Sequence, residues 1–263
     1  MTGQAAALRA EADGGSVSDE GQSGDGQGSA FARSVSALLE RTEYRRCESG
    51  EDLEAIYRLR YKAYKAYGLV GEAENERICD AMDDTPNSYR FGVFIDGELV
   101  STVRLHHITA AEPWGPVMRV YSDMLEPRLA AGETFVNPGQ FTADPSVAGS
   151  FRLLPYLTLR LAVIANTYFD STSCVCLIRD EHVAFYKRIF GSAQVGLARP
   201  YPPFTVPVML YESNCEENMA KTVARYPFFR STFAERRLLF QRPDAGELTP
   251  LTVLPTAKYR VAA

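Results

Sequence analysis

Histidine is scarce in this chain and a basic excess is missing, and each absence excludes a class of function. The 263 residues include only three histidines, two of them adjacent (His106 and His107), so we expect no histidine-based metal site. The formal net charge is −5, the opposite of the basic excess typical of nucleic-acid-binding proteins. We therefore expect neither a bound metal nor a nucleic-acid partner.

Long apolar runs are also missing. The apolar stretch at residues 5–8 is too short for the core of a secretory signal, and no other run is long enough to cross a bilayer. The five cysteines are odd in number and form no metal-ligand spacing. Cys174 and Cys176 lie in an apolar run, where a thiolate is unfavourable, so we do not expect nucleophiles. We expect reduced cysteines that serve packing, in a cytoplasmic protein.

The composition is that of a globular protein with a polar tail. Hydrophobic residues make up 46% of the chain and charged residues 23%, which is ordinary for a soluble domain. Residues 1–33 are rich in Gly, Ser, Asp and Gln, so they cannot bury enough apolar surface to offset the entropy lost on ordering. We expect a disordered tail over 1–33, a single domain over 34–225, and a C-terminal extension over 226–263 packed on that domain.

A β-hairpin is the clearest local signal. Two β-rich runs, 89–95 and 98–106, flank Asp96-Gly97, a preferred pair for a two-residue turn. A regular register about this turn pairs Tyr89 with Arg104. It also places Arg104 on a mostly apolar face of the hairpin.

The other patterns predict alternating strands and helices. We expect, in order, a helix at 31–40, a strand at 44–47, a helix at 51–67 begun by Ser49, the hairpin, a helix at 122–131, an interrupted strand at 133–143, an apolar helix at 152–169, a strand at 172–178, a helix from Asp180 to Gly191, strands at 194–198 and 206–211, and a helix at 213–225. This order predicts a mixed α/β (α+β) fold, antiparallel first and with a parallel crossover later.

Two arginines stand where the folding pattern predicts apolar residues. Arg60 lies in the apolar stripe of the helix at 51–67, and Arg104 lies in the hairpin. Guanidinium groups are rarely buried unless paired, and Asp80 and Asp83 lie between the two arginines in the sequence. This pattern predicts a polar site in an apolar pocket. The alternative is an ion-pair network that only fixes the helix on the sheet.

The strand at 133–143 is interrupted by Pro138-Gly139, and proline inside a strand indicates a bulge or an edge. A bulge here is expected to splay this strand from the strand at 172–178. Splaying frees backbone N–H groups, with Gly139, Gln140 and Phe141 as candidates, to bind a pantetheine-like ligand or to polarise a thioester carbonyl. The alternative is a bulge that only curves the sheet.

Five stretches together resemble one known family. They are Tyr57-Arg-Leu-Arg-Tyr61 with Tyr64, Asp80-x-x-Asp83, the hairpin from Phe91 to Leu105, Phe141-Thr-Ala-Asp-Pro145, and Glu181 to Gly191. In this order and spacing the chain resembles the GNAT-type N-acyl amino acid synthases (FeeM-like) and their relatives, the acyl-homoserine-lactone autoinducer synthases. The resemblance covers roughly residues 43–212. It implies a single GNAT-like domain with a mixed central sheet splayed at a bulged strand and helices on both faces.

The resemblance implies an N-acyltransferase that moves a fatty acyl chain from acyl carrier protein to the amine of an amino acid or similar small amine. Asp83 is our first choice, and Asp80 our second, for the group that takes the ammonium proton. Arg104 or Arg60 is expected to hold the acceptor's carboxylate. The candidate catalytic residues are Asp83, Asp80, Arg104 and Gln140, and the candidate substrate-binding residues are Arg60, Tyr64, Asn137, Gly139 and Phe141.

Some positions depart from the family pattern and keep two alternatives open. Gln140 stands where the family usually has arginine, and the acidic residues usual in autoinducer synthases are absent near Asn137 and at Ile78. The alternatives are an autoinducer synthase and a non-catalytic GNAT-like module that binds an acyl carrier or a lipid. Residues 146–150 match a pyrophosphate loop poorly, which favours a carrier-protein donor over coenzyme A. We expect no cofactor beyond the acyl-phosphopantetheine thioester, which is a co-substrate.

Two basic surfaces suggest further partners. Arg152, Lys187 and Arg188 are expected to attract the acidic acyl carrier protein, although they also fit a plain solvated helix face. Residues 225–242 carry five arginines interleaved with aromatic residues, so we expect weak contact with a membrane surface. The alternative is that these aromatic residues pack on the domain.

Overall fold

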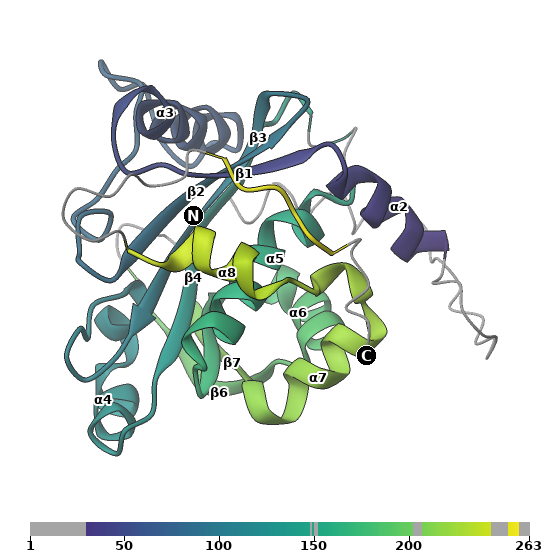
Figure 1. Ribbon diagram of the computed structural model, residues 1–263. Coiled ribbons are helices and arrows are strands. Elements are labelled where there is room, and N and C mark those ends of the chain that lie inside the picture. Colours follow the sequence, from purple (N-terminus) through teal and green to yellow (C-terminus); the bar gives the residue numbers. More distant parts are fainter. Residues whose placement is uncertain (1–29, 148, 150–151, 202–206, 243–251, 258–263) are drawn as a thin grey trace.

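Seven strands form a single mixed sheet in the part of the chain that the structure describes (Figure 1). This structure is a computed structural model, and it describes residues 30–147, 149, 152–201, 207–242 and 252–257. The strands are β1 (Thr42–Arg46), β2 (Ser88–Ile95), β3 (Glu98–Ile108), β4 (Phe135–Ala143), β5 (Ser173–Ile178), β6 (Ala193–Arg199) and β7 (Val208–Asn214). They lie in the order β1-β2-β3-β4-β5-β7-β6; β4 and β5 are parallel, and the other neighbours are antiparallel. The predicted mixed fold with a late parallel crossover is confirmed.

Helices cover both faces of this sheet. They are α2 (Ala30–Leu39), α3 (Gly50–Ala66), α4 (Pro116–Ala130), α5 (Leu154–Phe169), α6 (Val183–Phe190), α7 (Cys215–Arg225) and α8 (Phe233–Phe240), with 3₁₀ turns η1 (Asp180–His182) and η2 (Pro227–Phe229). Every residue of α5 from Leu154 to Asn166 is buried, which is expected of a helix that is apolar all round. No helix of the described residues is long and apolar enough to cross a membrane.

Alternate residues of the central strands point to different helices. Phe135 on β4 and Val175 on β5 pack against α4. Val136 and Cys176, which point to the opposite face, belong to the larger core built around α5. In Figure 1, α5 to α8 lie together in front of the sheet.

The hairpin turn is as predicted, but its register is not. Asp96 and Gly97 both have positive φ (52° and 85°), as the favoured two-residue turn requires. A β-bulge then shifts the strands, so that Tyr89 lies opposite Leu105 and Arg104 lies opposite Arg90. The predicted pairing of Tyr89 with Arg104 was therefore wrong, because the strand β3 contains one residue more than a regular ladder allows.

The predicted interruption and splaying of β4 are confirmed. Gly139 pairs with Arg104 and Thr142 pairs with Thr102, so the two residues Gln140 and Phe141 stand opposite one residue of β3. The bulge thus follows the Pro138-Gly139 pair, and Gln140 adopts a positive φ of 50°. On its other side, β4 pairs with β5 only at Phe135 and Val136. Beyond these two positions the strands separate.

Several helices begin at other residues than the sequence predicted. The helix expected at 122–131 begins at Pro116, because proline in the first turn is preset for a helix, and its backbone is kinked at Tyr121. The turn from Asp180 is 3₁₀ before α6 begins. The tail expected over 1–33 falls outside the described residues up to 29, and residues 30–33 already belong to α2.

The segment after residue 226 supplies part of the main core. Phe228, Phe229 and Phe240 are each 1% exposed and lie in the same cluster as α5. Arg160, buried within α5, donates to both carboxylate oxygens of Glu235 on α8, at 2.5 and 3.0 Å. A buried arginine needs such a partner, so this ion pair fastens α8 to the central helix.

Candidate functional site

A buried ion-pair network joins α3, β3 and the loop that precedes β2. Arg60 Nη1 lies 2.9 Å from both carboxylate oxygens of Asp83, and Arg104 Nη1 lies 3.1 Å from Asp83 Oδ1. Asp83 also accepts the backbone N–H of Asp80 at 2.9 Å. The side chains of Arg60 and Asp83 are both 0% exposed. Asp83 is thus occupied by donors and closed to solvent.

Asp80 is the member of this network that reaches solvent. Arg104 donates to both of its oxygens, at 2.6 and 3.3 Å, yet the Asp80 side chain is 35% exposed. Burial raises the pKa of Asp80, but the charge and hydrogen bonds of Arg104 outweigh it and hold that pKa below its usual value. Asp80 is therefore an ionised carboxylate at neutral pH, fixed on one side and open on the other.

The bulge of β4 is linked to this carboxylate. Gln140 Nε2 donates to Asp80 Oδ2 at 3.2 Å, and the Tyr64 hydroxyl donates to Gln140 Oε1 at 2.5 Å. The amide of Gln140 therefore connects α3 to Asp80 through one chain of hydrogen bonds. This contact places a partly exposed carboxylate beside the part of β4 that no longer pairs with β5.

His106 forms a hydrogen bond with the loop that carries Asp80 and Asp83. Its Nε2 lies 2.9 Å from the carbonyl oxygen of Met82, in the turn between the two aspartates. Burial, and then the charge of Arg104, lower the pKa of His106 to about 4. The ring is thus neutral at physiological pH and donates through Nε2.

Asn137 braces the point where the strands separate. Its Nδ2 donates to the carbonyl oxygen of Val175 on β5 at 2.8 Å, and its Oδ1 accepts the backbone N–H of Val117 at 3.3 Å. Phe141 is fully buried in the main core. Both residues are enclosed, and the substrate-binding roles expected for them, for Gly139, for Tyr64 and for Arg60 stay predictions.

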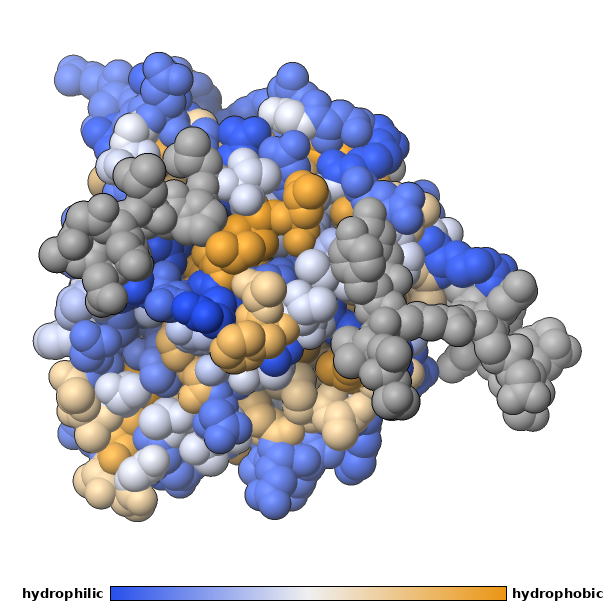
Figure 2. Space-filling model, in the orientation of Figure 1, coloured by the Kyte–Doolittle hydropathy of each residue, from blue (hydrophilic) through white to orange (hydrophobic). Residues whose placement is uncertain are grey.

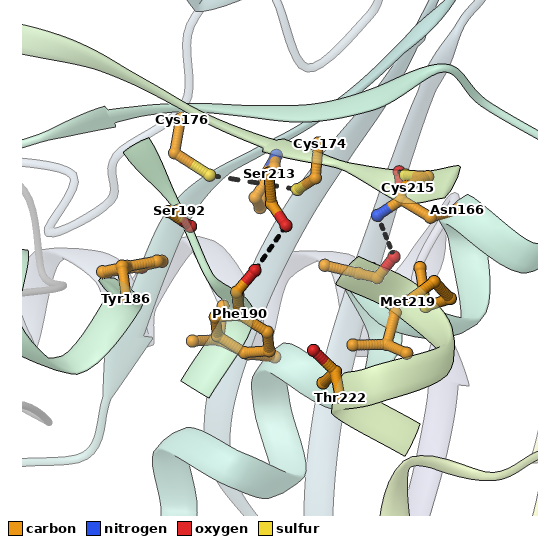
Figure 3. Close-up of a pocket in the computed structure, with 14 residues that line it drawn as sticks. Asn166, Cys174, Cys176, Tyr186, Phe190, Ser192, Ser213, Cys215, Met219 and Thr222 are labelled. Atoms are coloured by element: carbon orange, nitrogen blue, oxygen red, sulfur yellow. Dashed lines mark hydrogen bonds between the residues drawn. The ribbon is translucent and has the colours of Figure 1, made fainter. Parts of the chain in front are cut away.

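An apolar pocket opens on the other face of the sheet, next to the splayed strands (Figure 3). Its cavity of about 40 Å³ has walls from α5, α6, α7, β5 and β7, and Pro138 of β4 also lines it. Two of its hydroxyl groups are bonded to backbone: Ser213 donates to the carbonyl oxygen of Phe190 at 2.5 Å, and Thr222 to that of Ile189 at 3.3 Å. Most of the other residues that line the pocket are apolar.

Three cysteines line this pocket, which sequence reasoning had treated only as packing residues. Cys174 and Cys176 hold their sulfur atoms 4.0 Å apart, side by side in Figure 3, and Cys215 lies nearby. Burial raises the pKa of Cys215 to about 12. The hydrogen bond with Cys174 and burial raise that of Cys176 well above its usual value. Neither of these two thiols is a thiolate at neutral pH.

The predicted carrier-docking residues are exposed. Lys187 and Arg188 lie in the last turn of α6, and Arg152 lies just before α5. Their docking role stays a prediction. Among the described residues, no group of three or more His, Cys, Asp or Glu side chains is arranged to hold a metal ion.

The FeeM sequence family, described as N-acyl amino acid synthase FeeM, matches residues 55–214. Among solved structures, FeeM, an N-acyl amino acid synthase from uncultured soil microbes, is 17% identical with a TM-score of 0.57, covering 71% of this chain and 99% of that chain. TofI, solved in a ternary complex with an inhibitor and MTA, is 15% identical with a TM-score of 0.51, covering 71% of this chain and 96% of that chain. No curated protein matches the sequence.

The shared fold confirms the predicted GNAT-like acyltransferase architecture. The family match spans more than half of the 263 residues, including the network around Asp83 and the bulged strand. The chain therefore belongs to the FeeM N-acyl amino acid synthase family and is an acyltransferase of that family.

Proposed function

We propose that this protein is an N-acyltransferase that moves a fatty acyl group from the thioester of acyl carrier protein to the amine of an amino acid or a similar small amine. One observation carries the proposal. Asp80, an ionised and partly exposed carboxylate, is hydrogen-bonded to Gln140 in the bulge of β4, on the part of this strand that no longer pairs with β5. A proton acceptor and a gap for an extended thioester arm thus lie side by side.

The separation of β4 from β5 is suited to the phosphopantetheine arm of the acyl donor. Beyond Val136 no strand of the described residues pairs with the edge of β4 that faces β5, so we expect backbone N–H groups there to bind an extended amide-bearing arm. The apolar pocket is lined by Pro138, on the part of β4 that no longer pairs with β5, and by residues of α5, α6 and α7. We expect the phosphopantetheine arm in the gap and the acyl chain in the pocket. The pocket must widen to take a long chain, because its present volume of about 40 Å³ suits only a few water molecules.

The chemistry needs no covalent enzyme intermediate, because a thioester is already activated. Holding the amine against the carbonyl contributes about 7–11 kcal/mol, and a backbone donor to the oxyanion about 3–4 kcal/mol. Asp80 takes a proton from the ammonium group of the acceptor, directly or through a water molecule, and the neutral amine then attacks the thioester carbonyl. Asp83, the first choice from the sequence, has no exposed surface, so we assign it the task of holding Arg60 and Arg104 in place.

The loop after β4 supports acyl carrier protein over coenzyme A as the donor. The Asp144 carboxylate accepts the backbone N–H of Ser146 at 2.8 Å and pairs with Lys62 at the same distance. A diphosphate requires free N–H groups and positive charge, and here an aspartate occupies one such group. The exposed Lys187 and Arg188 supply basic charge for an acidic carrier protein.

A direct assay tests the proposal. The purified protein is incubated with acyl-carrier protein or acyl-coenzyme A and a panel of amino acids and amines, and products are identified by mass spectrometry. We expect an N-acyl product and one free thiol per turnover, formed faster from the carrier protein. A lactone made only from S-adenosylmethionine would identify an autoinducer synthase, and carrier binding without any product would identify a non-catalytic module.

A further inference from the structure

Two cysteines on β5 lie on the same side of that strand. Cys174 and Cys176 are two residues apart in an extended segment, so their side chains point to one face of the sheet. Their sulfur atoms lie 4.0 Å apart, and both residues line the apolar pocket (Figure 3). The two thiols therefore form a pair in the wall of a cavity.

This thiol pair lies where β4 and β5 separate. Cys174 is the register partner of Val136, the last residue of β4 that pairs with β5, and Cys176 lies on the part of β5 that no longer pairs with β4. Val175 stands between the two cysteines, and its carbonyl oxygen accepts a hydrogen bond from Asn137 Nδ2 at 2.8 Å. A change in the spacing of the two sulfur atoms would thus act on the contact that braces the separating strands.

The two thiols differ in exposure and in acidity. Cys174 is partly exposed, whereas Cys176 is buried. The hydrogen bond with Cys176 lowers the pKa of the Cys174 thiol against the opposing effect of burial, and a hydrogen bond with Asn166 lowers it further. Cys174 is therefore the thiol that forms a thiolate more readily, and Cys176 is a second thiol held beside it.

We propose that Cys174 and Cys176 are a modification site for hydroperoxides, at which oxidation joins the two sulfur atoms in a disulfide bond and thereby slows acyl transfer. The cavity of about 40 Å³ has room for a few water molecules, and hence for hydrogen peroxide. The effect on acyl transfer rests on the proposed function, whereas the formation of the disulfide does not.

The oxidation takes two steps. The Cys174 thiolate attacks one peroxide oxygen, so that an S–O bond forms, the O–O bond breaks, and the released hydroxide takes up the proton of that thiol as water. The Cys176 sulfur then attacks the Cys174 sulfur, so that the S–S bond forms, the S–O bond breaks, and a second water molecule leaves with the proton of Cys176. Two electrons pass from the two thiols to one peroxide.

The strand must contract locally to accept this bond. Two residues of an extended strand span about 6.6 Å between their Cα atoms, which is near the upper limit for a disulfide. The sulfur atoms must also approach from 4.0 Å to about 2 Å. We expect this contraction to shift Val175, to weaken its hydrogen bond with Asn137, and so to disturb the space beside the separated strands.

Peptide mapping of the full-length protein tests the disulfide directly. Trypsin cleaves after Arg160 and Arg179, and the peptide 161–179 contains Cys174, Cys176 and no other cysteine. The protein is treated with hydrogen peroxide, unfolded, alkylated with iodoacetamide and digested for mass spectrometry. We expect this peptide to be unalkylated and lighter by two hydrogen atoms, and to accept two alkyl groups after reduction with dithiothreitol. A peptide alkylated at both cysteines, or oxidised without an S–S bond, would overturn the proposal.

Acyl transfer before and after peroxide treatment gives the functional readout, with each protein compared with its own untreated rate. For wild type, kcat/KM is expected to fall at least about tenfold, because the strands that position the thioester shift, and to recover with dithiothreitol. Cys174→Ala cannot form the disulfide and is expected to keep its rate after peroxide. Disulfide formation in wild type without loss of transfer, or an equal loss in folded Cys174→Ala, overturns the inhibitory role.

Cys79→Ser is the matched control. Cys79 is exposed and adjoins Asp80, so its oxidation is the other way in which peroxide could slow the reaction. This variant is expected to be as sensitive to peroxide as wild type, and a loss of that sensitivity would assign the inhibition to Cys79 and overturn our account of it. Failure of untreated wild type to acylate any amine overturns the proposed function alone, because the disulfide is read from the peptide.

Discussion

The Nη1 atom of Arg60 lies 2.9 Å from both carboxylate oxygens of Asp83, and neither side chain is exposed to solvent. This contact ties the middle of α3 to the loop that carries both aspartates. Asp83 therefore holds the loop in place and fixes the position of Asp80.

Asp83→Asn is therefore expected to destabilise the fold. The amide leaves Arg60 without a negative partner in a buried site and leaves Arg104 with Asp80 alone, and breaking a buried ion pair costs about 3–5 kcal/mol. Urea denaturation followed by circular dichroism measures the loss in free energy of unfolding. Wild-type stability combined with lost activity would instead favour Asp83 as the proton acceptor, as the sequence first suggested.

Gln140→Gly separates the conformation of the bulge from its hydrogen bonds. Glycine adopts the positive φ of 50° without strain, but it removes the amide that links Tyr64 to Asp80. We expect stability within about 1 kcal/mol of wild type and a kcat lowered about tenfold, because Asp80 loses one positioning contact. Gln140→Asn, which also tolerates this backbone, is the control with a shorter amide. An unchanged kcat in Gln140→Gly would remove the bulge from the mechanism.

Acid is expected to weaken the fold through His106. Its pKa is about 4 in the folded protein and about 6.5 when unfolded, so the unfolded chain binds the proton more readily. The contribution of His106 is complete above pH 6.5 and is lost as the pH falls towards 4, by about 3 kcal/mol. Urea midpoints measured between pH 8 and 4 should fall more steeply for wild type than for His106→Gln. Parallel curves for the two proteins would contradict this assignment.

Membrane contact is expected at a smaller surface than the sequence indicated. Tyr226, Phe228, Phe229 and Phe240 are buried and pack on the domain, as the alternative interpretation held. Phe233, Leu238 and Leu254 remain exposed, and Figure 2 shows apolar side chains gathered on the face that carries α8. We propose weak, salt-sensitive binding to anionic vesicles through this surface.

Cosedimentation with anionic and neutral vesicles tests that binding. The variant Phe233→Ser with Leu238→Ser changes only exposed side chains and should remain folded while losing the bound fraction. Equal sedimentation with both lipid types, or no effect of the double substitution, would leave these residues as ordinary surface.

The sequence revealed the features that depend on neighbouring residues. Pro138-Gly139 predicted the interrupted strand and Asp96-Gly97 predicted the turn, because both features are determined by a few neighbouring residues. The extra residue in β3 that shifts the hairpin carries no such signal, so the partner of Arg104 was predicted wrongly. A bulge is decided by how both strands pack.

Features built from distant segments were missed. The buried carboxylate of Glu235 on α8 depends on Arg160, 75 residues earlier, and no local pattern predicts that pairing. The apolar pocket has walls from five elements, so no single stretch could indicate it. The exposure of Asp80 and the burial of Asp83, three residues apart in one loop, likewise follow from the position of α3.

The most direct test compares kcat for acyl transfer in Asp80→Asn with that of wild type. Asp80 is 35% exposed, so this substitution should leave the protein folded, which circular dichroism and thermal unfolding can verify. If Asp80 takes the proton of the attacking amine at the splayed strands, kcat should fall at least about 100-fold, with the KM for the acyl donor nearly unchanged. A folded Asp80→Asn protein that transfers the acyl group at the wild-type rate would contradict the account.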